Sequence, residues 1–350
     1  MQFEAGVVDG DGHVIERRPD LERHGWQGRA TELIEMLLSW HDRDAWGSAI
    51  RPEVRDGAFD PDARLLDMNK EGIDIAVNYP TPLLGVSDFA DVDSSVGVCR
   101  AYNDWFFEQY HLAAVDRLHA TAIVPLTDPS AAAREAIRAV RDLDAVGVMV
   151  QPYAGDIHLC DRQLDVLWGA VEELGVPVGV HGSRHTCAPH LRPESFRNQA
   201  RFYAASHPFQ QQMAMGDLSL GGVLERFPHL KVVFLEAGIG WMPSFFDRLD
   251  GAYESVREDW LSDRDELSCT PSEYFLSGNC WFSCEPDEPN LAAMVDSLGE
   301  DQVIYASDYP HFDCDFPNSV AELVDNSGLS SRVLEKVLGR NAARVYGLGR

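Results

Sequence analysis

The residues best suited to chemistry lie near the two ends of the chain, and both groups follow apolar segments. Near the start, residues 7–14 (VVDGDGHV) contain Asp11 and His13. Side chains two apart on a β-strand point to the same face, so this carboxylate and imidazole can meet at one cation. Near the other end, the apolar run 303–307 leads into Asp308. A closed barrel would bring the first and last strands together and join the two groups.

A third group ends the apolar run 176–181 with His181. A single histidine at a strand end is more often structural than functional. Four residues of metal-ligand type at the ends of expected strands indicate a common site instead. We therefore expect one divalent metal ion, bound by Asp11, His13, His181 and Asp308.

The elements that must position these residues are apolar, β-branched segments separated by helical patterns. Residues 128–143 open with Asp-Pro, and residues 163–174 end at a glycine, so both read as helices. Strands that alternate with helices form parallel sheets, and their number favours a (β/α)8 TIM barrel of the α/β class over an open sheet. The expected strands are 7–14, 73–79, 118–126, 145–151, 176–181, 231–236, 280–284 and 303–307.

Two connections are longer than plain crossovers, and both follow strands that carry candidate ligands. They are residues 15–72 after the first strand and 182–229 after the fifth. The active sites of such barrels lie at the C-terminal ends of the strands, so we interpret both insertions as walls or lids over the site. No repeat or linker divides the chain, and we expect one domain over residues 1–350.

The composition excludes several classes of protein. A formal net charge of −28 argues against binding nucleic acid, which requires basic patches. No apolar run reaches the roughly 20 residues of a membrane span, and the N-terminus lacks the pattern of a signal peptide. Seven cysteines at irregular spacing do not form a disulfide framework. We expect a cytoplasmic protein that acts on a small molecule.

Motifs along nearly the whole chain resemble the amidohydrolase superfamily, in the branch of aminocarboxymuconate-semialdehyde decarboxylase and γ-resorcylate decarboxylase. The resemblance implies a metal-dependent TIM-barrel enzyme, often a homodimer. It assigns metal binding to Asp11, His13, His181 and Asp308, and proton transfer also to Asp308. The motifs are DGDGHVIE (9–16), YNDWF (102–106), AIVPLTDP (122–129), KVVFLEAGIGWMP (231–243), YASDYPH (305–311) and LGRNAARVYGL (338–348).

The chain departs from this family pattern at two positions. Asp11 stands where relatives usually have His or Glu, which gives the site two oxygen and two nitrogen donors, suited to Mn²⁺ as well as Zn²⁺. Glu236 stands where decarboxylases usually have His. A partly buried Glu can act as a general acid or base, can orient substrate or a ligand histidine, or can be a structural residue held by hydrogen bonds.

Further candidates surround these residues. Arg184 and His185 directly follow His181 and can grip a substrate carboxylate or phenolate, although a surface salt bridge would equally explain Arg184. His311 follows Asp308 and either contacts substrate or caps its loop.

The ligands alone suit two reactions. The whole-chain resemblance favours a C–C lyase of the decarboxylase type, in which the metal chelates a small aromatic or unsaturated carboxylic acid. Asp308 and Glu236 would then shuttle the proton beside His181. The alternative is a hydrolase that uses metal-activated water on an amide, ester, lactone or C–C bond. A non-catalytic binding protein is the third reading, and the complete ligand set argues against it.

Overall fold

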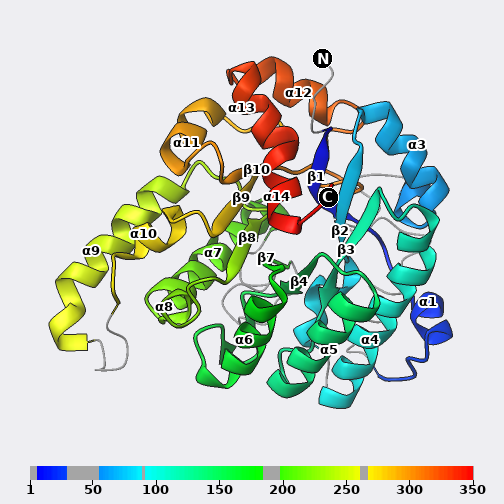
Figure 1. Ribbon diagram of the computed structural model, residues 1–350, viewed down its shortest axis with the longest axis horizontal. Helices are drawn as coiled ribbons and strands as arrows, with labels where there is room; N and C mark the ends of the chain where they lie inside the picture. Colours follow the sequence, from blue (N-terminus) through cyan, green and yellow to red (C-terminus); the bar gives the residue numbers. More distant parts are fainter. Residues whose placement is uncertain (1–5, 30–54, 89–90, 184–197, 261–266, 350) are drawn as a thin grey trace.

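Eight parallel strands form the framework of the structure, and helices cover their outer side (Figure 1). The computed structural model describes residues 6–29, 55–88, 91–183, 198–260 and 267–349. Each barrel strand pairs with the next barrel strand along the chain, so the expected (β/α)8 barrel is confirmed, while β5 (Tyr153–Ala154) and β6 (Ile157–His158) form a separate hairpin. The barrel strands are β1 (Val8–His13), β2 (Ile75–Tyr79), β3 (Leu118–Ile123), β4 (Gly147–Val150), β7 (Pro177–His181), β8 (Lys231–Leu235), β9 (Cys280–Cys284) and β10 (Val303–Tyr305).

The first and last strands meet, as the sequence predicts. The backbone N–H of Asp308 donates to the carbonyl of Asp11 at 3.1 Å, and the N–H of His13 donates to the carbonyl of Tyr309 at 2.6 Å. In Figure 1, β1 and β10 accordingly lie side by side. This contact brings the two terminal motifs to one mouth of the barrel, where the C-terminal ends of all the parallel strands lie.

Helices follow most of the strands and return the chain to the start of the next one. They are α1 (Arg18–Arg23), α3 (Pro61–Glu71), α4 (Val92–Gln109), α5 (Pro129–Asp142), α6 (Asp165–Leu174), α7 (Gln199–Ser219), α8 (Val223–Arg226), α9 (Met242–Trp260), α10 (Pro271–Leu276), α11 (Leu291–Leu298), α12 (Ser319–Asn326), α13 (Ser331–Glu335) and α14 (Asn341–Tyr346).

Local signals explain where the two expected helices begin and end. The Asp128 side chain accepts a hydrogen bond from the backbone N–H of Ala131 and so caps α5, and Pro129 occupies the first turn. Helix α6 ends at Gly175, whose φ of 72° is the left-handed conformation that glycine adopts without strain. Both helices are confirmed.

The second insertion contributes a 21-residue helix, α7, that is tied to the mouth of the barrel. The buried Gln211 amide donates to the carbonyl of Val180 at 2.7 Å and to the carbonyl of Leu235 at 2.8 Å. Because these carbonyls lie on β7 and β8, the position of α7 is fixed relative to the ends of both strands. Parts of both insertions, residues 30–54 and 184–197, lie outside the described residues.

The closing helix expected over residues 330–348 is interrupted. A π-helical turn, Lys336–Arg340, separates α13 from α14. Helix α14 still packs against the barrel, since the Tyr346 hydroxyl lies 2.8 Å from the Tyr79 hydroxyl on β2. Among the described helices, none combines the length and the apolar character that a membrane span needs.

Candidate metal centre

The four expected ligands come together at the mouth of the barrel. Nε2 of His13 lies 3.5 Å from Oδ1 of Asp11 and 3.5 Å from Oδ1 of Asp308. Nε2 of His181 lies 3.6 Å from the same Asp11 oxygen. Strands β1 and β7 therefore supply three side chains that can share one cation, and Asp308, on the loop after β10, joins them through its contact with His13.

Both imidazoles are oriented by a backbone carbonyl. Nδ1 of His13 lies 2.8 Å from the carbonyl of Pro80, and Nδ1 of His181 lies 2.6 Å from the carbonyl of Gly182. A carbonyl only accepts hydrogen bonds, so each Nδ1 carries the proton. In the neutral rings, Nε2 then keeps a lone pair that faces the centre of the cluster, as metal-binding histidines require.

Two carboxylates reach the cluster through an unusual backbone conformation. Glu236 directly follows β8, Asp308 lies three residues after β10, and their φ values are 48° and 52°. The left-handed region is sparsely populated by residues other than glycine, and such strain concentrates at functional sites. Here it turns both side chains inward at the points where β8 and β10 lead into their loops.

A buried network beneath the site supports the ligands. Asp9, which is fully buried, accepts hydrogen bonds from the backbone N–H of Ser307 at 2.9 Å and from its hydroxyl at 2.6 Å. The Arg64 guanidinium lies 3.6 Å from Asp9 and also donates to the carbonyls of His13 and Tyr309 at 3.4 and 3.3 Å. Asp9 thus positions the loop that carries Asp308 and is not itself among the clustered ligands.

The cluster fits a bound cation. Both carboxylate oxygens of Asp11 and the Nε2 atoms of His13 and His181 are buried and make no hydrogen bond. One ligand atom from each of these three residues lies within 4.8 Å of the others, and a second such group joins His13 to Glu236, Asp308 and His311. Buried polar atoms without partners are costly, and a divalent ion would satisfy them together.

Protons bind tightly to the cluster when no cation neutralises it. Burial raises the pKa of Asp11 to about 6, although His181 opposes this rise. Burial alone would lower the pKa of His181, but Asp11 and Glu236 outweigh it and raise the value to about 10. Burial and the nearby Glu236 raise the pKa of Asp308 well above its usual range. The site therefore prefers positive charge, as a proton or as a metal ion.

Glu236 bridges two imidazoles. Its Oε2 lies 3.2 Å from Nε2 of His181, and its Oε1 lies 3.1 Å from Nδ1 of His207 on α7. Burial alone would raise the pKa of Glu236, but the positive charge of His207 and the close contacts with both imidazoles hold it well below its usual range. Without a cation, the pKa values of Glu236 and Asp308 are therefore shifted in opposite directions, the pattern by which neighbouring carboxyl groups take separate base and acid roles.

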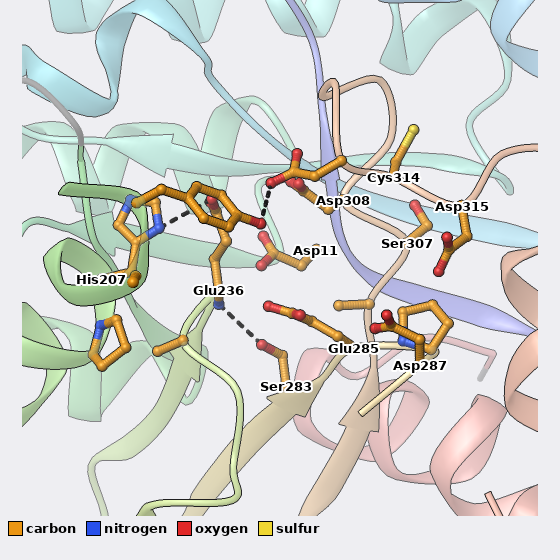
Figure 2. Close-up of a pocket in the computed structure, with 17 residues that line it drawn as sticks. Asp11, His207, Glu236, Ser283, Glu285, Asp287, Ser307, Asp308, Cys314 and Asp315 are labelled. Atoms are coloured by element: carbon orange, nitrogen blue, oxygen red, sulfur yellow. Dashed lines mark hydrogen bonds and ion pairs between the residues drawn. The ribbon is translucent and has the colours of Figure 1, made fainter. Parts of the chain in front are cut away.

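A cavity of about 220 Å³ opens beside the cluster. Figure 2 shows Asp11, Glu236 and Asp308 at one end of it and Glu285 and Asp287 at another. None of the described lining residues is a lysine or an arginine, and His207 is the only histidine among them. The acidic lining residues are Asp11, Glu236, Glu285, Asp287, Asp308, Asp313 and Asp315.

The expected substrate-binding residues differ in where they lie. His311 is buried behind Asp308, with its Nδ1 2.6 Å from Oδ1 of Asp308 and its Nε2 3.2 Å from the Thr81 hydroxyl. It is not among the residues that line the cavity, so a contact with substrate stays a prediction for His311. Arg184 and His185 lie outside the described residues.

Sequence reasoning did not single out His207, although it lies at the centre of this site. Its ring reaches the cavity because α7 folds back over β7 and β8, and no spacing in the sequence encodes that contact. The Tyr203 hydroxyl, which donates to Asp313 at 2.7 Å, was missed for the same reason. The one available signal was a histidine followed by a proline, His207-Pro208, within the second insertion.

Comparisons with known proteins agree with this geometry. The family model described as Amidohydrolase matches residues 8–348. The chain is 25% identical to 2-amino-3-carboxymuconate-6-semialdehyde decarboxylase of Dictyostelium discoideum over 308 residues, 85% of this chain and 79% of that protein. It is 25% identical to the γ-resorcylate decarboxylase of a Polaromonas strain over 313 residues, 85% of this chain and 91% of that protein.

A solved structure shares the fold. The 5-carboxyvanillate decarboxylase of Novosphingobium aromaticivorans, solved with manganese and 3-methoxy-4-hydroxy-5-nitrobenzoic acid, superposes with a TM-score of 0.79 at 21% sequence identity. The alignment covers 99% of this chain and 98% of that one. The resemblance seen in the sequence is confirmed, and the match over nearly the entire chain shows that this protein belongs to the amidohydrolase family of enzymes.

Proposed function

We propose that this protein is a metal-dependent C–C lyase that releases carbon dioxide from a small aromatic or unsaturated carboxylic acid. The observation that carries the proposal is the cluster of buried, unpartnered ligand atoms on Asp11, His13 and His181, next to a cavity. Relatives over most of the chain are named as decarboxylases of such acids, which favours this reaction over hydrolysis.

Asp11, His13, His181 and Asp308 would hold one divalent ion, and their mixed oxygen and nitrogen donors suit Mn²⁺ or Zn²⁺. The structural neighbour solved with manganese supports Mn²⁺ as the first ion to test. When bound, the ion would supply a Lewis acid that binds the oxygens of the acid and draws electron density from the reacting carbon.

Asp308 is placed to handle the proton. Loss of carbon dioxide leaves an electron pair on the carbon that carried the carboxylate, and a proton must replace the lost group there. The place of Asp308 on the cavity wall, beside the other proposed ligands, suits a donor of that proton. Glu236 stays ionised beside it and is suited to accept a proton in return.

Substrate selection belongs to the residues around the cavity. Its volume of about 220 Å³ is small for a ligand site and suits an acid with a single ring. Binding of the substrate by Arg184, His185 and His311 stays a prediction, as do a single domain, a homodimer and a location in the cytoplasm.

Two measurements test the proposal. Elemental mass spectrometry of the purified protein should find about one Mn or Zn per chain, and an Asp11→Ala/His13→Ala double variant should lose it. Carbon dioxide release should then be assayed with γ-resorcylate, 5-carboxyvanillate and related unsaturated acids. Asp308→Asn should keep most of the metal and lose turnover by a factor on the order of 10² to 10⁴, the usual range for a proton-transferring group. No metal in the wild-type protein after supplementation, or hydrolysis without decarboxylation, would refute the lyase assignment.

A further inference from the structure

His207 occupies a position that the proposed reaction does not yet use. Its Nδ1 lies 3.1 Å from Oε1 of Glu236, while its Nε2 is buried and has no hydrogen-bond partner. The residue lines the cavity, and Figure 2 shows its ring beside Glu236. An imidazole that is held through one nitrogen and leaves the other unsatisfied is prepared to bind a ligand.

The backbone around His207 is fitted to this placement. A Cβ atom at Gly182 would lie 2.6 Å from Cδ2 of His207, so only glycine at position 182 admits the ring where it stands. The buried Gln210, also on α7, holds the same segment through reciprocal hydrogen bonds with Ser183, from the Ser183 N–H and to its carbonyl, each 3.0 Å long. The helix and the segment after β7 are therefore locked together on either side of the imidazole.

Glu236 fixes the orientation of the His207 ring. The Glu236 backbone N–H donates to the Ser283 hydroxyl at 3.1 Å, and its carboxylate spans His181 and His207. A carboxylate that accepts the Nδ1 proton of a histidine directs Nε2 of that ring toward the reacting molecule, as in the Ser-His-Asp arrangement of hydrolases.

The negative charge of the cavity wall makes the His207 imidazole important for binding an anionic ligand. The described lining residues include seven carboxylates and no lysine or arginine, so His207 is the only one of them that can carry a positive charge. An anionic substrate would meet repulsion from the ionised carboxylates among the described wall residues. Among the described lining residues, His207 is the one side chain that can offer its oxygens a positively charged donor.

We propose that His207 is a catalytic residue that contacts an anionic oxygen of the substrate through Nε2, and that Glu236 is the residue that positions its ring. The inference rests on the proposed function for the identity of the substrate as an acid. It changes the assignment of Glu236, which acts through His207 and not directly on the reacting carbon.

The test uses the full-length, manganese-loaded protein and compares His207→Gln and His207→Ala with the wild type. His229→Gln is the matched control, because His229 is exposed and lies away from the cavity lining. The probe is 3-methoxy-4-hydroxy-5-nitrobenzoic acid, the nitrophenol bound in the manganese-containing neighbour, and an absorbance titration follows its binding. Metal content is measured for each variant, so that loss of the ion is not mistaken for loss of the imidazole.

We expect both His207 variants to keep one metal ion per chain, to bind the probe at least tenfold more weakly and to lose at least tenfold in kcat/KM. Free imidazole should restore part of the activity of His207→Ala and none in His207→Gln, whose longer side chain fills the space. Glu236→Gln should cost less than His207→Ala, and the double variant His207→Gln/Glu236→Gln should be little worse than His207→Gln alone, since the two residues act as a unit.

Two outcomes are distinguishable. A wild-type protein that decarboxylates none of the acids refutes the proposed reaction, while the probe affinities still decide the role of His207. If the wild type and metal-loaded His207→Ala bind the probe with equal affinity, or if neither binds it, the contact between His207 and the substrate is refuted.

Discussion

Gly182→Ala offers a way to displace the His207 ring without replacing any side chain of the site. The new Cβ would lie 2.6 Å from Cδ2 and 3.3 Å from Cγ of the ring. Carbon atoms pack comfortably from about 3.4 Å outward, so the ring must retreat by roughly 0.8 Å. Starting from 3.1 Å, the contact between His207 and Glu236 then lengthens beyond the range of a normal hydrogen bond.

The cost of this displacement follows from the charge on Glu236. Hydrogen bonds to charged groups contribute about 1.5 to 3 kcal/mol, and each 1.4 kcal/mol corresponds to a tenfold change in rate. We therefore expect kcat/KM for the decarboxylated acid to fall by about 10- to 100-fold in Gly182→Ala. Steady-state kinetics on manganese-loaded protein provides the assay. Metal content must be measured in parallel, because the Gly182 carbonyl also orients His181, a proposed ligand.

Gly216→Ala is the matched control for this experiment. Gly216 lies on the same helix, α7, and a Cβ added there meets no atom within 4 Å. We expect unchanged kinetics and a gain in stability of up to about 1 kcal/mol, because alanine favours helix more than glycine does. Wild-type kcat/KM in a folded, metal-loaded Gly182→Ala protein would refute the reasoning about the His207–Glu236 pair.

Three further predictions concern the groups around the site. Arg64→Met should lower the free energy of unfolding, measured by denaturant titration, by about 3 to 5 kcal/mol, because it leaves the buried carboxylate of Asp9 without its positive partner. Adding Asp9→Asn should recover part of this loss, and a double variant whose loss is the sum of the two single losses would contradict the pairing. Burial raises the pKa of Glu16 to about 8 from an ordinary 4.5, so between these pH values the folded chain holds a proton on Glu16 that the unfolded chain has lost. The free energy of unfolding should therefore fall as pH rises from 4.5 to 8, by at most about 5 kcal/mol. Glu16→Gln should remove this pH dependence, and the same dependence in the variant and the wild type would contradict the assignment. Asp11 and Glu236 raise the pKa of His181 to about 10, so Mn²⁺ must displace a proton from this imidazole. The affinity for Mn²⁺ should therefore fall as pH is lowered from 9 toward 6, and binding in weak buffer should release protons. An affinity that does not change with pH would exclude this competition.

Much of this molecule follows from local patterns in the sequence. Segments with alternating or continuous apolar residues, typical of strands, are separated by capped helices. Parallel strands joined by helical crossovers have few possible arrangements, and eight of them close into one barrel here. The strand ends then determine the ligand site. Asp11, His13, His181 and Asp308 each follow the apolar part of a strand, so closing the barrel necessarily gathers them at one mouth.

Contacts between distant segments could not be predicted in the same way. His207 reaches Glu236 only because Gln211 ties α7 to the ends of β7 and β8, and Gly182 leaves room for the ring. No periodicity within α7 marks the face that will cover the cavity. The same holds for Arg64, which arrives from the first insertion to meet Asp9.

The sequence by itself therefore determined the barrel and the proposed set of metal ligands, because both depend on the residue types at strand ends and on rules of chain connectivity. Only the tertiary structure decided the surroundings of those ligands: which imidazole faces the cavity, which carboxylate holds it, and which acids form the wall. These contacts join residues whose separation along the chain carries no signal, and they arise when packing fixes one helix against two strands.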